Sequence, residues 1–78
     1  MTKTLRERFE IALKMRGETL TKRLARKLVY TRKEGGYYYL GKSGSLRHGE
    51  TIAGSIPVSD KFKQLLLELT MERNLTNV

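Results

Sequence analysis

Residues 28–46, LVYTRKEGGYYYLGKSGSL, decide how this chain is expected to fold. The stretch contains all four tyrosines of the chain and four of its seven glycines. Segments 28–33 and 37–40 are rich in β-branched and aromatic residues, which favour strands, and the glycines between them are typical of a turn. The sequence therefore predicts a β-hairpin over residues 28–41.

The length of this turn decides which side chains share a face of the hairpin, because strand side chains alternate with period two. With a two-residue turn at Glu34-Gly35 or Gly35-Gly36, a basic and aromatic face is expected to hold Tyr30, Arg32, Tyr37 and Tyr39. The opposite, core-facing set is then Val29, Thr31, Tyr38 and Leu40. A three-residue turn would change the parity and break this partition, so the sequence leaves open which tyrosines face solvent.

A first helix is predicted over residues 5–16. The segment Thr4-Leu5-Arg6-Glu7 matches a capping box, in which the threonine and glutamate side chains each bond the backbone N–H of the other residue. Apolar side chains then recur at helical spacing, and Gly17 suits the position just after a helix. Both ends of this helix are therefore marked in the sequence.

A second, shorter helix is predicted over residues 20–27. Thr19 or Thr21 can cap it, and its apolar stripe consists of Leu20, Leu24, Ala25 and Leu28. Residues 5–28, LRERFEIALKMRGETLTKRLARKL, resemble the first two helices of the phage-repressor helix-turn-helix family over about a third of the chain. The likeness ends where a third helix should follow, since the next residues are strand-like. It implies only how the two helices would pack.

The remaining residues are predicted to form a short strand and loop over 45–58 and a last helix over 60–73, followed by a tail over 75–78. Pro57 excludes helix just before it, and Ser59 is suited to cap the last helix. The whole chain is thus expected to be one small α+β domain over residues 1–78. Two N-terminal helices would precede a central antiparallel β-hairpin or three-stranded sheet, and the C-terminal helix would pack on that sheet.

The positive charge of the chain is concentrated in its middle third. The net charge is +8 and the isoelectric point is about 10.1. Residues 20–49 carry eight basic side chains against Glu34 alone, which gives +7, whereas residues 1–19 carry +2 and residues 50–78 carry −1. A pI above about 9 with clustered lysines and arginines is typical of proteins that bind polyanions.

The residue types present exclude several kinds of site. The chain has no cysteine, so disulfides and thiolate metal sites are excluded, and the single His48 cannot form a metal site alone. The acids are expected on helix exteriors, and no nucleophile–base arrangement with an oxyanion hole is recognisable. We therefore expect no enzymatic activity, no cofactor and no metal. No apolar run approaches about 18 residues and the N-terminus is too charged for a signal peptide, which predicts a cytoplasmic protein without a membrane partner.

The leading hypothesis is a nucleic-acid-binding protein, with DNA preferred over RNA, acting as a regulator or accessory factor of the phage or plasmid type. Lysine and arginine attract phosphates, and tyrosines beside an arginine can stack on the bases of a single strand. A two-stranded ribbon can also enter a major groove. The candidate binding residues are Lys22, Arg23, Arg26, Lys27, Tyr30, Arg32, Lys33, Tyr37, Tyr39, Lys42, Arg47 and His48.

The alternative is a protein-interaction module, such as a small inhibitor or adaptor that docks on a larger acidic or nucleic-acid-associated protein. Tyrosine and arginine are also enriched at binding hot spots, so the same hairpin serves both hypotheses. A homodimer is a further possible partner arrangement, because a chain of this size can bury only a small core.

Overall fold

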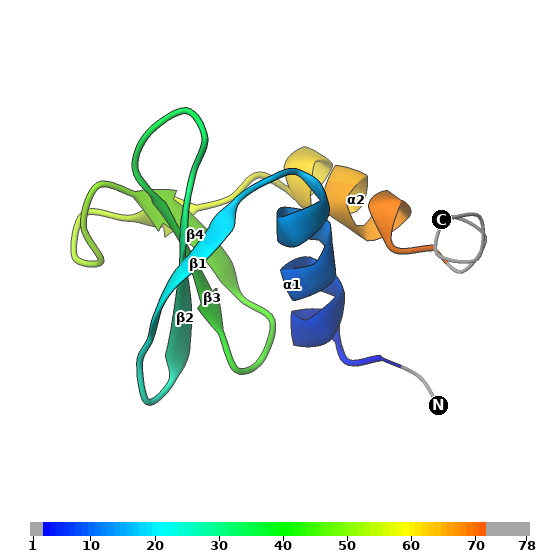
Figure 1. Ribbon diagram of the computed structural model, residues 1–78, viewed down its shortest axis with the longest axis horizontal. Coiled ribbons are helices and arrows are strands. Elements are labelled where there is room, and N and C mark those ends of the chain that lie inside the picture. The colour runs from blue at the N-terminus through cyan, green and yellow to red at the C-terminus, as the bar shows by residue number, and fades with distance from the viewer. Residues whose placement is uncertain (1–2, 72–78) are drawn as a thin grey trace.

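Two helices cover one face of a five-stranded antiparallel sheet in the computed structural model, which describes residues 3–71 (Figure 1). The strands lie in the sheet in the order in which they occur in the chain. The α+β class predicted from the sequence is confirmed, with two helices in the described residues instead of three. The elements are α1 (Leu5–Met15), β1 (Thr19–Arg23), β2 (Lys27–Thr31), β3 (Tyr37–Gly41), β4 (Leu46–Gly49), β5 (Ile56–Pro57) and α2 (Asp60–Leu69).

Helix α1 begins as the sequence predicts and ends one residue earlier than the predicted range. The backbone N–H of Thr4 donates to Glu7 Oε1 at 2.8 Å, and the N–H of Glu7 donates to Thr4 Oγ1 at 3.1 Å. The hydrogen bond from the Thr4 backbone lowers the pKa of Glu7. At the other end, Gly17 has a φ of +90° and the N–H of Glu18 donates to the Leu13 carbonyl at 3.0 Å, which is the Schellman arrangement.

The second helix predicted over residues 20–27 is wrong, because this segment forms β1 and the turn into β2. Strand β1 pairs antiparallel with β2, placing Leu20 opposite Tyr30, and has a bulge between Leu20 and Lys22. Without β1, one edge of β2 would leave its backbone hydrogen-bonding groups unpaired beside the core, and this tertiary demand overrides local helix propensity. The likeness to helix-turn-helix proteins therefore does not extend to the structure.

The hairpin predicted over residues 28–41 is confirmed, but its turn has three residues. The N–H of Arg32 donates to the Gly36 carbonyl at 3.0 Å, which leaves residues 33–35 as the turn. Tyr30 consequently lies opposite Tyr38 in the β2–β3 pair. Of the turn lengths that the sequence leaves open, the three-residue turn is therefore the one observed, and the partition of side chains expected for a two-residue turn does not hold.

The two faces of the sheet have different surroundings. The face toward the helices holds the side chains of Leu28, Tyr30, Tyr38, Leu40 and Leu46, which are all buried. These join residues of both helices and of the segment before α2 in one apolar core, whose other buried members are Phe9, Ala12, Leu13, Val58 and Leu66. The opposite face, called the open face below, bears Lys22, Lys27, Val29, Thr31, Tyr37, Tyr39 and Arg47.

The C-terminal half follows the prediction more closely. Residues 45–58 contain the two short strands β4 and β5 and the loop between them, and α2 begins at Asp60. Ser59 caps this helix, since its Oγ accepts the N–H of Phe62 at 3.2 Å. Helix α2 ends at Leu69 with Thr70 as its C-cap, so the predicted helix end at residue 73 is wrong. The predicted tail over 75–78 lies outside the described residues. Within the part of the chain that the structure describes, no helix is long and apolar enough to cross a membrane.

The turn between β3 and β4 packs on the start of α1, and this contact gives a stability prediction. A Cβ added to Gly44 would lie 2.7 Å from Leu5 Cδ2, whereas a Cβ on Gly35 would meet nothing within 4 Å. Both glycines have positive φ, +94° and +101°. Gly35→Ala is therefore expected to cost about 1–2 kcal/mol of backbone strain, and Gly44→Ala about 1–3 kcal/mol more because of the clash. Urea unfolding of both variants measures the difference, and equal losses would contradict the contact with α1.

Candidate nucleic-acid interface

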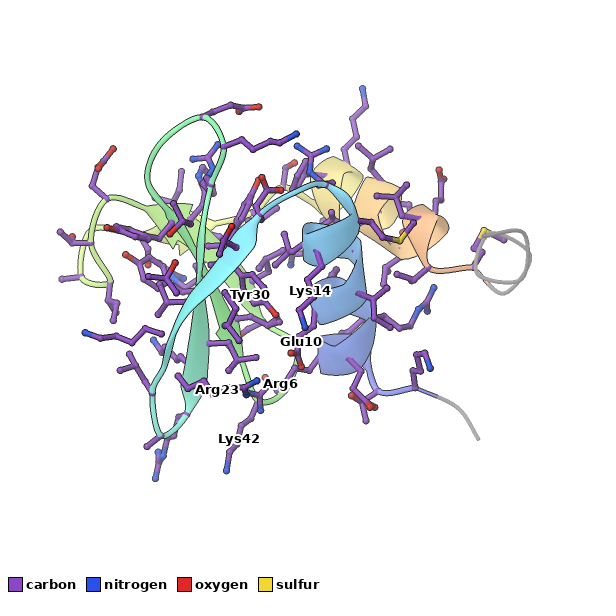
Figure 2. All side chains as sticks on the ribbon, in the orientation of Figure 1. Arg6, Glu10, Lys14, Arg23, Tyr30 and Lys42 are labelled. Carbon is purple, nitrogen blue, oxygen red and sulfur yellow. The ribbon has the colours of Figure 1, made fainter. Side chains whose placement is uncertain are left out.

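One end of the sheet collects basic side chains from two neighbouring turns. The β1–β2 turn and the β3–β4 turn lie at the same end because Lys27 pairs with Gly41 across β2 and β3. In Figure 2 the labelled side chains of Arg23 and Lys42 extend toward this end. We call the set the basic end, and it consists of Lys22, Arg23, Arg26, Lys27 and Lys42.

The charges of the basic end are accessible and uncompensated. Its side chains are exposed, except that of Lys27, which is half-buried. None of the five forms an ion pair with an acidic side chain among residues 3–71, where the ion pairs are Arg16–Glu18, Arg32–Glu34 and Lys63–Asp60. The structure therefore brings five of the candidate binding residues together at one end of the sheet, and their role in binding stays a prediction.

Arg6 is a further cation at the basic end that the sequence reasoning missed. The β3–β4 turn packs on Leu5, and Arg6 is the next residue in α1. The pKa of Tyr30 is raised overall, but the positive charges of Arg6 and Arg23 act against this rise. Both guanidinium groups therefore lie near the phenol of Tyr30. The Nε of Arg6 is buried and has no hydrogen-bond partner among the described residues. A helix prediction alone gives no signal that its first turn meets a distant hairpin.

The tyrosines do not form the exposed row that was expected. Tyr30 is fully buried in the core, and its hydroxyl donates to Glu10 Oε1 at 3.2 Å. Burial, followed by the nearby Glu10 carboxylate, raises the pKa of Tyr30 to about 12. Tyr37 and Tyr39 lie on the open face with ring centroids 6.2 Å apart, but Tyr39 is only 5% exposed. Of the two candidate tyrosines on the open face, Tyr37 is half-buried and Tyr39 is buried, so Tyr37 has the more accessible ring.

The remaining candidate residues lie away from the basic end or are held by other parts of the protein. Arg47 donates from Nε to Ser55 Oγ at 2.9 Å, which fastens the β4–β5 loop to β4. Arg32 donates to His48 Nδ1 at 3.3 Å, and both lie at the opposite end of the sheet. Lys33 is exposed in the β2–β3 turn, also at that end. The twelve candidates are thus divided between the two ends of the sheet, its open face and its core.

The open face has an apolar hollow of about 260 Å³ next to the basic end. Leu24 of the β1–β2 turn and Ile52 of the β4–β5 loop both contribute to it and are 38% and 43% exposed. The other lining residues are Thr21, Lys22, Val29, Tyr37 and Tyr39. Basic and apolar side chains therefore adjoin on this surface.

No protein-family model, curated protein or solved structure that was compared with the chain matches it. Among residues 3–71 there is also no group of histidine and acidic side chains that could hold a metal ion. The interpretation of function rests on the charges and contacts of the described residues.

Proposed function

We propose that this protein binds nucleic acid, DNA in preference to RNA, through phosphate contacts made by its basic end, as a regulator or accessory factor. The observation that carries the proposal is the gathering of five cations in two adjacent turns and the strand ends beside them, with no ion-pair partner among residues 3–71. Solvated cations at such a density attract phosphates and release the counterions that surround them. Among the described residues of the sheet and its turns, the one cation with an acidic partner is Arg32, which lies at the opposite end.

Duplex DNA fits this surface better than single-stranded nucleic acid. Stacking of bases needs accessible rings, and Tyr30 and Tyr39 are both buried. The β1–β2 turn, by contrast, is exposed from Leu24 to Arg26 and belongs to a two-stranded ribbon. The major groove of B-form DNA admits such a ribbon, whereas the major groove of A-form RNA is too narrow for side chains to read.

Salt dependence tests the proposal. If the basic end neutralises roughly five phosphates, the logarithm of the association constant falls with the logarithm of salt with a slope of about −4.5. Affinity should then fall by a few hundredfold between about 50 and 200 mM salt. Fluorescence anisotropy with a labelled duplex, the matching single strand and a duplex RNA measures this directly. Absence of binding at the lowest salt would overturn the proposal, and preference for the single strand would overturn the duplex mode.

The apolar hollow on the open face favours a second candidate function, docking on a larger protein. Leu24 and Ile52 are exposed, apolar and close to basic residues, a combination typical of protein-binding surfaces. This candidate predicts a purified protein partner whose binding survives nuclease treatment and is lost with Ile52→Asp. Loss of the same binding on nuclease treatment would assign it to nucleic acid instead.

A further inference from the structure

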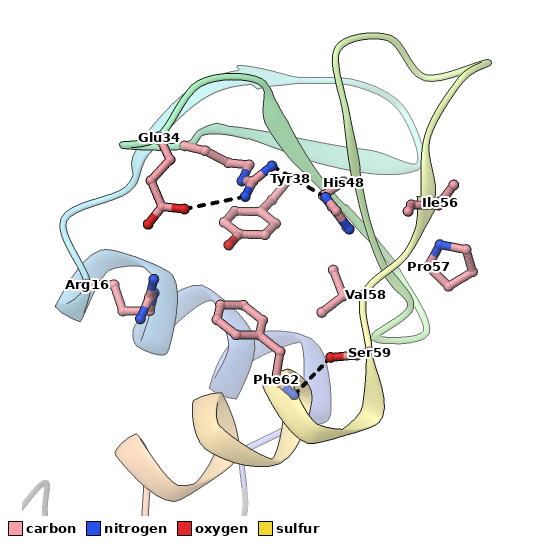
Figure 3. A pocket seen from close by; sticks show the side chains of 10 residues that line it. Arg16, Glu34, Tyr38, His48, Ile56, Pro57, Val58, Ser59 and Phe62 are labelled. Carbon is pink, nitrogen blue, oxygen red and sulfur yellow. Dashed lines mark hydrogen bonds and ion pairs between the residues drawn. The ribbon is translucent and has the colours of Figure 1, made fainter.

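A groove of about 480 Å³ lies at the end of the sheet opposite the basic end, between the sheet and the first turn of α2 (Figure 3). Its volume falls within the range of about 300–1,000 Å³ that is typical of small-molecule sites. One side of the groove is cationic, with Arg16 and Arg32, and the other is apolar, with Ile56, Pro57 and Val58. None of the residues of the basic end lines it.

The two guanidinium groups of this groove are each held against an aromatic ring. The Cζ atom of Arg16 lies 5.0 Å from the centroid of the Phe62 ring, and that of Arg32 lies 5.1 Å from the centroid of the Tyr38 ring. The two rings stack on each other with centroids 6.0 Å apart and an interplanar angle of 15°. The four side chains therefore form one connected unit, which positions both cations before any ligand arrives.

The acidic partners of the two arginines differ in how firmly they are held. Glu18 is buried, accepts from Arg16 Nε at 3.2 Å and also accepts the N–H of Lys33. Glu34 is 74% exposed, and its carboxylate lies 3.7 Å from Arg32 Nη2 as an ion pair, without a hydrogen bond to any residue among 3–71. The Nε of Arg32 is buried without a hydrogen-bond partner among the described residues. The Nη2 atom of Arg32 thus faces a loosely held, exposed carboxylate at 3.7 Å, which a ligand anion can displace.

We propose that this groove binds a small organic anion, with its carboxylate or phosphate group on Arg32 and Arg16 and its apolar part against Ile56 and Val58. The anion takes the place of the Glu34 carboxylate, which is a weak and solvent-exposed partner. Arginine is suited to such groups because its planar fork donates two parallel hydrogen bonds. The proposal is independent of nucleic-acid binding, since it concerns a different end of the sheet.

Titration of the whole protein with phenyl phosphate, followed by two-dimensional amide NMR, tests this site. We expect saturable shifts at Arg32, His48, Val58 and Phe62. Benzoate is expected to move the same signals, while inorganic phosphate, which lacks the apolar part, is expected to bind at least tenfold more weakly. Absence of saturable shifts up to about 10 mM phenyl phosphate, or shifts centred on the basic end, would overturn the proposal.

Two substitutions give opposite expected signs. Glu34→Gln removes the competing carboxylate and should tighten phenyl phosphate binding about two- to fivefold. Because the Glu34 side chain is 74% exposed, this substitution should leave the fold intact. Arg32→Lys keeps the charge but loses the fork and should weaken binding about tenfold. Lys42→Gln, at the basic end, is the matched control and should leave phenyl phosphate binding unchanged while weakening DNA binding. Unchanged or weaker binding in Glu34→Gln would contradict the displacement of that carboxylate.

Discussion

The double variant Arg26→Glu, Lys42→Glu is expected to bind duplex DNA roughly a hundredfold more weakly than the wild type at about 100 mM salt. Each phosphate contact contributes about 0.9 decades of affinity at this salt concentration, so two lost contacts account for nearly two decades. The reversed charges then repel the backbone as well. Both residues are exposed and unpaired, so the substitutions should leave the fold intact.

A matched control for this variant is available on α2. Lys61→Glu, Lys63→Glu changes the net charge by the same amount, and acidic residues are tolerated in the first turns of a helix. The variant also removes the ion pair of Lys63 with the fully exposed Asp60, which should cost little stability. We expect it to reduce affinity severalfold at most and to leave the salt slope unchanged. The basic-end variant should instead lower the slope by about 1.8. Equal losses in the two double variants would show that net charge, rather than the basic end, determines binding.

The second large effect concerns stability at high pH and depends on Tyr30. Its pKa of about 12 in the folded protein lies above the value near 10 of an unfolded chain. The neutral phenol is therefore favoured by folding, and its contribution is complete below pH 10 and is lost as the pH rises through 12. The wild type should lose about 2 kcal/mol of unfolding free energy from this group by pH 12.

Tyr30→Phe isolates this contribution because the ring stays in the core while the titrating hydroxyl is removed. Near neutral pH the variant should be less stable by about 1–2 kcal/mol, since Glu10 loses a hydrogen bond. The unfolding free energies of the two proteins should converge as the pH approaches 12, because only the wild type loses the contribution of the Tyr30 hydroxyl. The lysines and the other tyrosines titrate in both proteins and therefore do not change the difference. Denaturant unfolding at several pH values measures the gap, and a gap that stays constant would contradict the raised pKa.

Local signals in the sequence marked where both helices begin but did not mark the outer strand β1. The capping box at Thr4 and the cap at Ser59 both involve side-chain bonds within three residues, which a sequence displays directly. The β1–β2 turn, in contrast, is centred on Ala25 and Arg26, where Leu24 donates its N–H to the Lys27 carbonyl. It contains no glycine, asparagine, aspartate or proline to mark it, so the helical spacing of the leucines prevailed in the prediction.

The positions of charges were easier to predict than their partners. Contiguous cations of residues 22–27 remained together because a tight hairpin keeps neighbours in sequence close in space. Arg32 and Arg47 belong to the same charged stretch, yet both form hydrogen bonds with residues further along the chain. Arg32 bonds His48, 16 residues away, and Arg47 bonds Ser55, 8 residues away. Such long-range bonds depend on strand register. One additional residue in the β2–β3 turn moved Tyr30 inward and changed the tyrosine face that the sequence favoured.

The outermost strands have a consequence for association between copies. The unpaired N–H and C=O groups of an exposed edge strand can pair with a strand of another chain, which is a common route to aggregation. Here one edge is β1, with a bulge and with Lys22 and Arg23, and the other is β5, with two residues of which one is Pro57. A bulge, charges and a proline all resist strand addition. Copies that meet at high concentration should therefore not grow into a continuous sheet, and any association between them would have to use the faces of the sheet or the helices.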